Sequence, residues 1–178
     1  MYDKLSYLLL QVRNPDDPMR RSEVVSFARS LRCDPSQIAI CDLLTSAPSR
    51  QQLDAADMVL LGGSGHYSVA TGHGPWLDRT LDALREISQE AKPTFASCWG
   101  FQAMSRALGC KVIHELERAE LGTQQLKLTE AGRNDPVFGI LDDEFRGQAG
   151  HEDRVDVLPE CAVLLASSAK VTNQAYRV

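Results

Sequence analysis

The sequence lacks the features of a membrane or secreted protein. No apolar run approaches the roughly 20 residues that span a bilayer. The first ten residues contain an apolar cluster, but neither a basic leader nor a small-residue cleavage site. We therefore interpret this region as the start of a first strand, and we expect a cytoplasmic protein with no membrane partner.

Nucleic-acid-binding proteins usually carry an excess of basic charge, and this chain does not. Its 19 Lys and Arg residues are scattered among 24 Asp and Glu residues, which gives a net charge of −5. Such a chain has no positive field that would gather phosphate groups. We expect no nucleic acid partner.

Paired cysteines are also missing. The chain has five cysteines, an odd number, and no Cys-x-x-Cys sequence. This spacing fits neither a disulfide framework nor a structural zinc site. We expect no metal and no cofactor, and each thiol has to be judged by its own surroundings.

What is present is the composition of one globular domain spanning residues 1–178, with 43% hydrophobic and 24% charged residues. Short apolar runs predict buried strands, and apolar residues at helical spacing predict helices between them. The predicted strands are 5–12, 38–41, 58–61 and 93–97, and the predicted helices follow Asp17-Pro18 or cover 76–90 and 100–108.

This alternation predicts an α/β fold with a mainly parallel sheet and helices on both faces. Ligands of such sheets bind at the carboxyl ends of the strands, where Gly62-Gly63 and Cys98 fall. After Gly109 the pattern becomes strand-like and predicts a small antiparallel extension. Its strands are expected at 111–115, 121–128, 162–167 and 171–178, with a short helical segment at 136–141.

Cys98 lies between a predicted buried strand and a predicted helix. A cysteine on such a turn has its sulfur near the N–H groups of the helix N-terminus, which favour the thiolate. The small neighbours Ala96 and Gly100 suit a strained turn that leaves little room beside a nucleophile. The alternative is a buried structural thiol, which is the commoner role of a cysteine.

The segment around Cys98 resembles the class I glutamine amidotransferase motif, in which a strand leads into Gly-x-Cys-x-Gly-x-Gln. Cys98, Gly100 and Gln102 match, and Ala96 replaces the first glycine. Two further segments resemble that family in the same order along the chain. They are the oxyanion loop Gly62-Gly63-Ser64 and the His-x-Asp-x-Val segment His151-Glu152-Asp153-Arg154-Val155.

The resemblance implies a flavodoxin-like fold and a role for each matching residue. The backbone N–H groups of Gly63 and Trp99 would stabilise the oxyanion formed when Cys98 attacks a glutamine side chain. The loop residue Gly62, together with Gln102, would border or hold the substrate. By the same resemblance Gly150 and His151 would hold it too, and Gly122 would border it in a segment that resembles the family's Glu-x-Gly.

The implied activity is hydrolysis of a side-chain amide through a Cys98 thioester, with release of ammonia and glutamate. The expected partners are glutamine or a γ-glutamyl compound, and the protein either works alone or docks on a separate synthase subunit that uses the ammonia. Two alternatives stay open. One is a γ-glutamyl hydrolase or peptidase of the same fold, and the other is a subunit that binds without turnover.

One family motif is missing from the sequence. The resemblance implies a catalytic base and its carboxylate in His-Pro-Glu, and no His-Pro-Glu occurs here. We expect the gene to continue past Val178 into this motif, and the 178 residues alone to be nearly inactive. A phosphate-binding role for the glycine-rich segment 62–74, which holds His66 and His73, is weaker because the Lys-Ser/Thr of a P-loop is absent.

Overall fold

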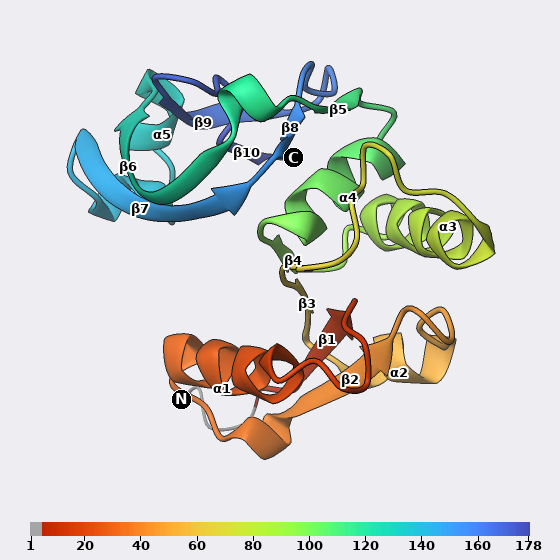
Figure 1. Cartoon of the computed structure of the whole chain (residues 1–178). Coiled ribbons are helices and arrows are strands. Elements are labelled where there is room, and N and C mark those ends of the chain that lie inside the picture. Colours follow the sequence, from red (N-terminus) through yellow and green to blue (C-terminus); the bar gives the residue numbers. More distant parts are fainter. Residues whose placement is uncertain (1–4) are drawn as a thin grey trace. The chain divides into compact units, whose positions relative to one another are not determined.

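The computed structural model describes residues 5–178, so the first four residues of the expected strand region lie outside it. Two compact units divide the chain, with unit 1 reaching Ala107 and unit 2 covering Leu108–Val178 (Figure 1). Each is described by itself below. The prediction of a single domain stays a prediction.

Unit 1 contains a four-stranded parallel sheet in the order β2-β1-β3-β4. β1 is buried along its whole length, as its continuous apolar run predicted. All four predicted strands are confirmed. They are β1 (Tyr7–Gln11), β2 (Ile38–Asp42), β3 (Met58–Leu61) and β4 (Thr94–Ala96).

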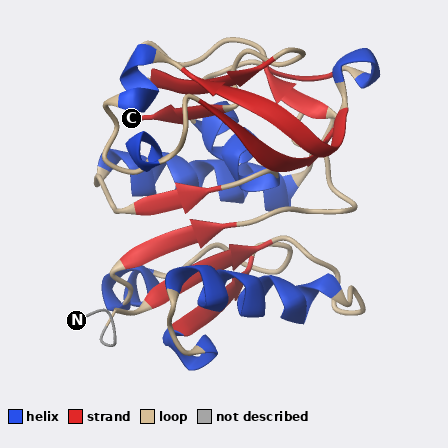
Figure 2. Cartoon of the chain, turned by 90° about the vertical axis from the view of Figure 1, so that its left-hand side faces the viewer, coloured by secondary structure: helices blue, strands red, loops and turns tan. Residues whose placement is uncertain are grey.

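Helices cover both faces of this sheet (Figure 2). Leu9 and Leu60 point to one face and pack with the apolar side of α1. Leu61 points to the other face, where it lies against Gly100 of α4. The helices of unit 1 are α1 (Met19–Leu31), α2 (Arg50–Ala55), α3 (Pro75–Gln89) and α4 (Trp99–Ala107), with a 3-10 turn η1 (Pro35–Gln37). The prediction of a parallel sheet between two helical layers is confirmed.

Unit 2 is built on antiparallel strands in the order β10-β9-β6-β7, with a separate pair β5-β8. The predicted antiparallel extension is confirmed, and it has as many strands in one sheet as unit 1. The strands are β5 (Val112–His114), β6 (Glu120–Leu128), β7 (Glu144–His151), β8 (Asp153–Val155), β9 (Val163–Ser168) and β10 (Ala175–Arg177). Short turns η2 (Leu116–Arg118), α5 (Glu130–Arg133) and η3 (Phe138–Ile140) connect them, and η3 occupies the predicted helical segment.

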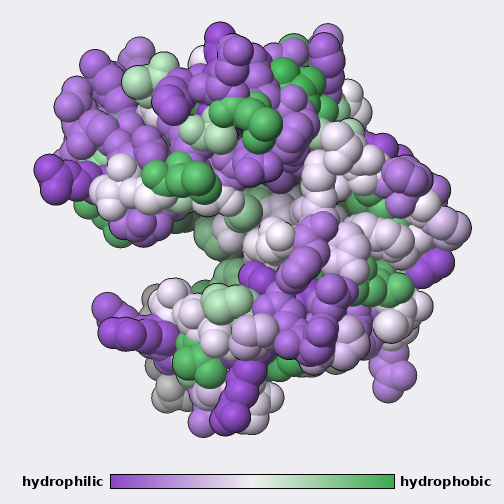
Figure 3. Space-filling view, viewed as in Figure 1, coloured by the Kyte–Doolittle hydropathy of each residue, from purple (hydrophilic) through white to green (hydrophobic). Residues whose placement is uncertain are grey.

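The surface of the chain is mostly hydrophilic on the face in Figure 3, where hydrophobic side chains gather only in small separate groups. Among the described residues, no helix combines the length and apolar character needed to cross a bilayer.

Candidate active site

Cys98 lies at a strand-to-helix junction, as the sequence predicted. β4 ends at Ala96 and α4 begins at Trp99, so the cysteine occupies the turn between them. Its φ is 52°, in the left-handed region that non-glycine residues rarely adopt. Ala96, which replaces the first glycine of the family motif, is not among the described residues with positive φ, so alanine fits there.

Cys98 has a different position relative to its helix from the other left-handed non-glycine residues described in unit 1. Only two other non-glycine residues in the described chain have positive φ, Arg32 and Ala91, and both follow the end of a helix, where this conformation is common. Cys98 instead precedes a helix. Strained nucleophiles on strand-to-helix turns have this geometry, so the backbone supports a nucleophile rather than a structural thiol.

The loop after β3 lies beside this cysteine. A Cβ added at Gly63 would be 3.6 Å from the Cys98 sulfur, and the carbonyl of Gly62 accepts a 2.9 Å hydrogen bond from the N–H of Gly100. The structure therefore brings together the loop and the cysteine that the sequence placed at neighbouring strand ends.

The sulfur of Cys98 is in a mixed electrostatic environment. The residue is solvent-accessible, yet burial by the protein around the sulfur is the main influence and raises the pKa of the thiol. Hydrogen bonds from the backbone N–H groups of Trp99 and Ser64, and the positive charge of Arg13, act in the opposite direction without outweighing it. The expectation of a favoured thiolate is wrong for this state, and attack requires a group that accepts the thiol proton.

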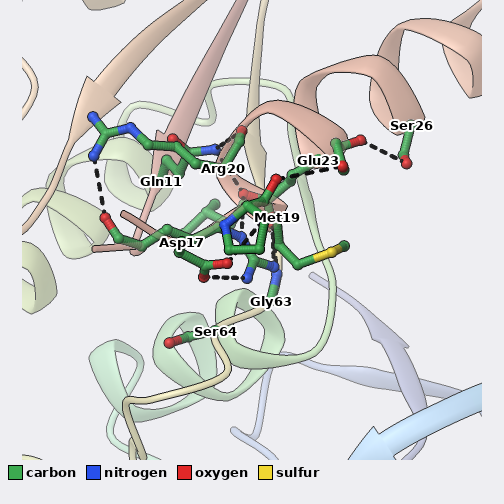
Figure 4. A network of polar contacts seen from close by, with 12 residues as sticks. Gln11, Asp17, Met19, Arg20, Glu23, Ser26, Gly63 and Ser64 are labelled. Atoms are coloured by element: carbon green, nitrogen blue, oxygen red, sulfur yellow. Dashed lines mark hydrogen bonds and ion pairs between the residues drawn. The ribbon is translucent and has the colours of Figure 1, made fainter. Parts of the chain in front are cut away.

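The amide of Gly63 has another partner in this conformation. Its N–H donates a 3.1 Å hydrogen bond to the carboxylate of Glu23, which is buried on α1 (Figure 4). The oxyanion role predicted for Gly63 and Trp99 stays a prediction. A carboxylate here would repel a phosphate, which argues against the phosphate-binding alternative for this loop.

The first helical turns of α4 are buried. The Trp99 ring stacks on Trp76 of α3, with ring centroids 6.1 Å apart, and Trp76 in turn meets Tyr67 edge to face. Gln102 lies one turn further along α4 and is also buried. The Trp99 side chain therefore packs α4 against α3, while the backbone N–H of Trp99 donates to the Cys98 sulfur.

The remaining predicted site residues lie together in unit 2. In the β6-β7 pair, Leu121 is opposite Gly150 and Glu120 is opposite His151. Gly122 has a φ of 83°, which only glycine adopts readily. The structure therefore gathers Gly122, Gly150 and His151 at one end of this pair, and their substrate role stays a prediction.

His151 lies beside two polar neighbours. Its Nδ1 lies 3.1 Å from the carbonyl oxygen of Asp153, and its Nε2 lies 3.4 Å from the Glu120 carboxylate. Glu120 is fully buried and also accepts a 2.7 Å hydrogen bond from the Ser168 hydroxyl. The Nε2 of His151 makes no hydrogen bond among the described residues, so Glu120 lies near the ring without bonding to it.

Sequence reasoning also missed Arg13 and Glu23 beneath the loop of unit 1. A signal was available, because Glu23 lies four and eight residues before Phe27 and Leu31 and so shares the apolar side of α1. His114 is exposed at the end of β5 and pairs with Asp153 at 2.9 Å. Across residues 5–178, no group of His, Cys, Asp and Glu side chains is arranged to hold a metal ion.

The chain is similar to proteins of a known family. The family model described as "Glutamine amidotransferase class-I" matches residues 23–177. Gamma-glutamyl peptidase 3 of Arabidopsis thaliana is 30% identical over 126 residues, which are 68% of this chain and 49% of that protein. The glutamine-hydrolyzing GMP synthase of Streptomyces avermitilis is 30% identical over 142 residues, 80% of this chain and 24% of that protein.

A solved structure shares the fold. The crystal structure of a glutamine amidotransferase from Thermotoga maritima superposes with a TM-score of 0.77 at 21% identity, covering 97% of this chain and 71% of that one. The chain spans about half the length of the gamma-glutamyl peptidase that it matches. Since the family model covers most of the sequence, the chain belongs to the class I glutamine amidotransferase family.

Proposed function

We propose that the protein hydrolyses the side-chain amide of glutamine, or a γ-glutamyl bond, through a thioester on Cys98. One observation carries the proposal: a cysteine with φ of 52° on a strand-to-helix turn, whose sulfur accepts hydrogen bonds from two backbone amides. A structural thiol needs neither the strained backbone nor the amides.

The chemistry follows from this arrangement. The Cys98 sulfur bonds to the amide carbon, and the carbonyl oxygen becomes an oxyanion that nearby N–H groups stabilise. The C–N bond then breaks, the nitrogen takes a proton and leaves as ammonia, and a thioester remains. Water attacks the thioester, releases glutamate and restores the thiol.

The second candidate is a γ-glutamyl peptidase, which uses the same nucleophile on a bond to an amino acid nitrogen. The relatives named gamma-glutamyl peptidase 3, 4 and 5 in Arabidopsis thaliana favour it. A binding-only subunit is the third candidate. The two relatives that are GMP synthases motivate the further proposal that a synthase partner uses the ammonia.

Product analysis separates these candidates. The protein is incubated with glutamine or with γ-glutamyl dipeptides, and ammonia, glutamate and released amino acid are measured. We expect Cys98→Ala to abolish release and Cys161→Ala, at another exposed thiol, to leave it unchanged. Equal product formation by Cys98→Ala would refute the proposal, and glutamine binding without product would support the binding-only candidate.

The base is a separate question. No His-Pro-Glu occurs in the 178 residues, so we propose that these residues alone turn over glutamine slowly, because general acid–base catalysis contributes about 100- to 10,000-fold. Comparison of this chain with one that carries such a motif tests this. The cytoplasmic location stays a prediction.

A further inference from the structure

We infer that Glu23, held by Arg13 and Gln11, is a positioning residue that fixes the loop beside Cys98 and so aims a backbone N–H at the reacting carbonyl oxygen. This inference rests on the proposed thioester chemistry. It assigns a role in that chemistry to a buried charge network that lies outside the family motifs (Figure 4).

The Glu23 carboxylate is saturated with donors. One oxygen accepts from the N–H of Gly63 at 3.1 Å and from Nη2 of Arg13 at 3.2 Å. The other accepts from Nε of Arg13 at 3.1 Å and from Nε2 of Gln11 at 2.9 Å. A second carboxylate, Asp17, bonds Nη1 of Arg13 at 3.1 Å and keeps the guanidinium in place.

This network is costly to bury, which argues for a purpose beyond stability. The Arg13 and Glu23 side chains are about nine-tenths buried, and buried ion pairs often contribute less stability than apolar residues of the same volume. In residues 5–178, the buried Oε1 of Gln11 is among the few side-chain atoms that find no hydrogen-bond partner. The Nε2 of Gln11 donates both to Glu23 and to the carbonyl of Arg20, while the Gln11 acceptor is left unpaired.

The Gly62-Gly63 peptide is held at both of its polar atoms. The carbonyl of Gly62 accepts from the N–H of Gly100 at the start of α4, and the N–H of Gly63 donates to Glu23. The contact is close, since a Cβ added at Gly62 would lie 2.0 Å from the Glu23 carboxylate. A peptide held at both ends resists rotation, and it fixes the position from which the next peptide starts.

The next amide along the loop belongs to Ser64, and it is one of the two that reach the Cys98 sulfur. Gly63 itself touches the site, because its added Cβ would be 3.6 Å from the sulfur and 3.7 Å from Nη2 of Arg13. With the Gly63 amide bound to Glu23, the structure assigns Ser64 as the oxyanion donor that acts with Trp99. Glu23 acts through the loop and does not itself touch the substrate.

The test measures acylation of Cys98 in the intact protein with a γ-glutamyl 4-nitrophenyl ester. The sulfur–carbon bond forms, the ester C–O bond breaks, 4-nitrophenolate leaves with the electron pair, and the thiol proton passes to water. Removal of one oxyanion donor lowers a rate constant about 100- to 1,000-fold, and a misplaced donor should cost less. We therefore expect Glu23→Gln to lower the first-turnover rate constant by roughly 100-fold or somewhat less, with an unchanged ester concentration at half-saturation. Alkylation of Cys98 by iodoacetamide is measured beside it.

Alkylation separates positioning from a general loss of structure, because it forms no oxyanion. Burial is the main cause that raises the pKa of Cys98, and the charge of Glu23 adds to it. Glu23→Gln removes that charge, so the rate of Cys98 alkylation should stay the same or increase while the rate of acylation decreases. Parallel loss of both would mean a structural role and would overturn the inference.

Two further variants complete the design. Gly62→Ala keeps every charge but pushes a methyl group into the Glu23 carboxylate, and it should lower acylation similarly even if Glu23→Gln folds poorly. Asp54→Asn removes an ion pair of unit 1 that lies on α2, with Arg50, and should leave acylation unchanged. Undiminished acylation in Gly62→Ala or in folded Glu23→Gln overturns the inference alone. No acylation of Cys98 in the unchanged protein overturns the proposed function and this inference with it.

Discussion

At the scale of single residues, the surroundings of Cys98 shift the pKa of its thiol in opposite directions. Its position on the turn brings two N–H groups to the sulfur, while burial by the surrounding protein raises the pKa of the thiol. The raised pKa favours the thiol form of Cys98. In the proposed reaction, Cys98 therefore depends on a group that accepts its proton.

The raised pKa predicts how Cys98 reacts with pH. Only the thiolate is alkylated, and its fraction grows as pH rises toward a pKa above the usual 8.5 or so of a cysteine. The iodoacetamide rate at Cys98, followed by peptide mass spectrometry, should therefore still be increasing above about pH 9. A rate that levels off below about pH 8 would show a stabilised thiolate and contradict this prediction.

At the scale of elements, the close approach of α4 to β3 fixes the position of Cys98. A Cβ at Gly100 would lie 2.3 Å from the Cβ of Leu61, so Gly100→Ala has to push the helix away from the strand. We expect a loss of about 1–3 kcal/mol in the free energy of unfolding, as for other overpacked cores, together with slower acylation of Cys98. Denaturant unfolding measures the first quantity.

The matched control is Gly65→Ala, because a Cβ added there would meet no atom within 4 Å. Its unfolding free energy should stay within about 0.5 kcal/mol of the unchanged protein. Equal stability of the two variants would show that the helix is not in contact with β3 as described.

Asp135 connects the turn before η3 to β10 in unit 2. Burial alone would raise the pKa of its carboxyl, but the N–H groups of Phe138 and Val137 and the Arg177 guanidinium outweigh burial and lower the pKa. A lowered folded pKa gives stability that is complete above the unfolded value near 3.9 and is lost as pH falls through the folded one. Thermal unfolding midpoints should therefore fall between about pH 5 and 2.

Asp135→Asn tests this linkage. Asparagine keeps an acceptor for the two N–H groups but loses the charge. We therefore expect the free energy of unfolding at pH 7 to fall on the order of 1 kcal/mol, and the unfolding midpoint to decrease less as the pH is lowered. Asp142→Asn, at an exposed position between η3 and β7, serves as control. An unchanged acid transition in Asp135→Asn would contradict the assignment.

Sequence periodicity predicted the helices and strands whose own residues show a clear apolar pattern. β1 and α3 carry a continuous apolar run and an apolar stripe, so both were predicted within a few residues. β7 was missed because it contains two glycines and no β-branched residue, and its strand conformation comes from pairing with β6. α2 was missed because six residues with one buried leucine are too few to show a period.

At the scale of the whole molecule, the sequence motifs predicted that the loop of Gly62 and Gly63 lies beside Cys98, but not what supports that loop. Glu23, Arg13 and Gln11 come from separate positions along the chain, and no local pattern shows that they meet beneath Gly63. The sign of the Cys98 pKa shift was also beyond the sequence, because it depends on how densely distant segments surround the sulfur. The family match shows that the chain belongs to the class I glutamine amidotransferases, and amide hydrolysis by Cys98 is our proposal.

The most direct test of that account is labelling of the intact protein with a glutamine-like diazoketone, followed by peptide mapping of all five cysteines. Recognition of the glutamine portion, rather than thiol acidity, should direct the reagent to Cys98, and added glutamine should protect it. Cys161 is the exposed internal control. The account predicts fast, glutamine-sensitive labelling of Cys98 alone; equal labelling of Cys33 or Cys161, or labelling of Cys98 that glutamine does not change, would contradict it.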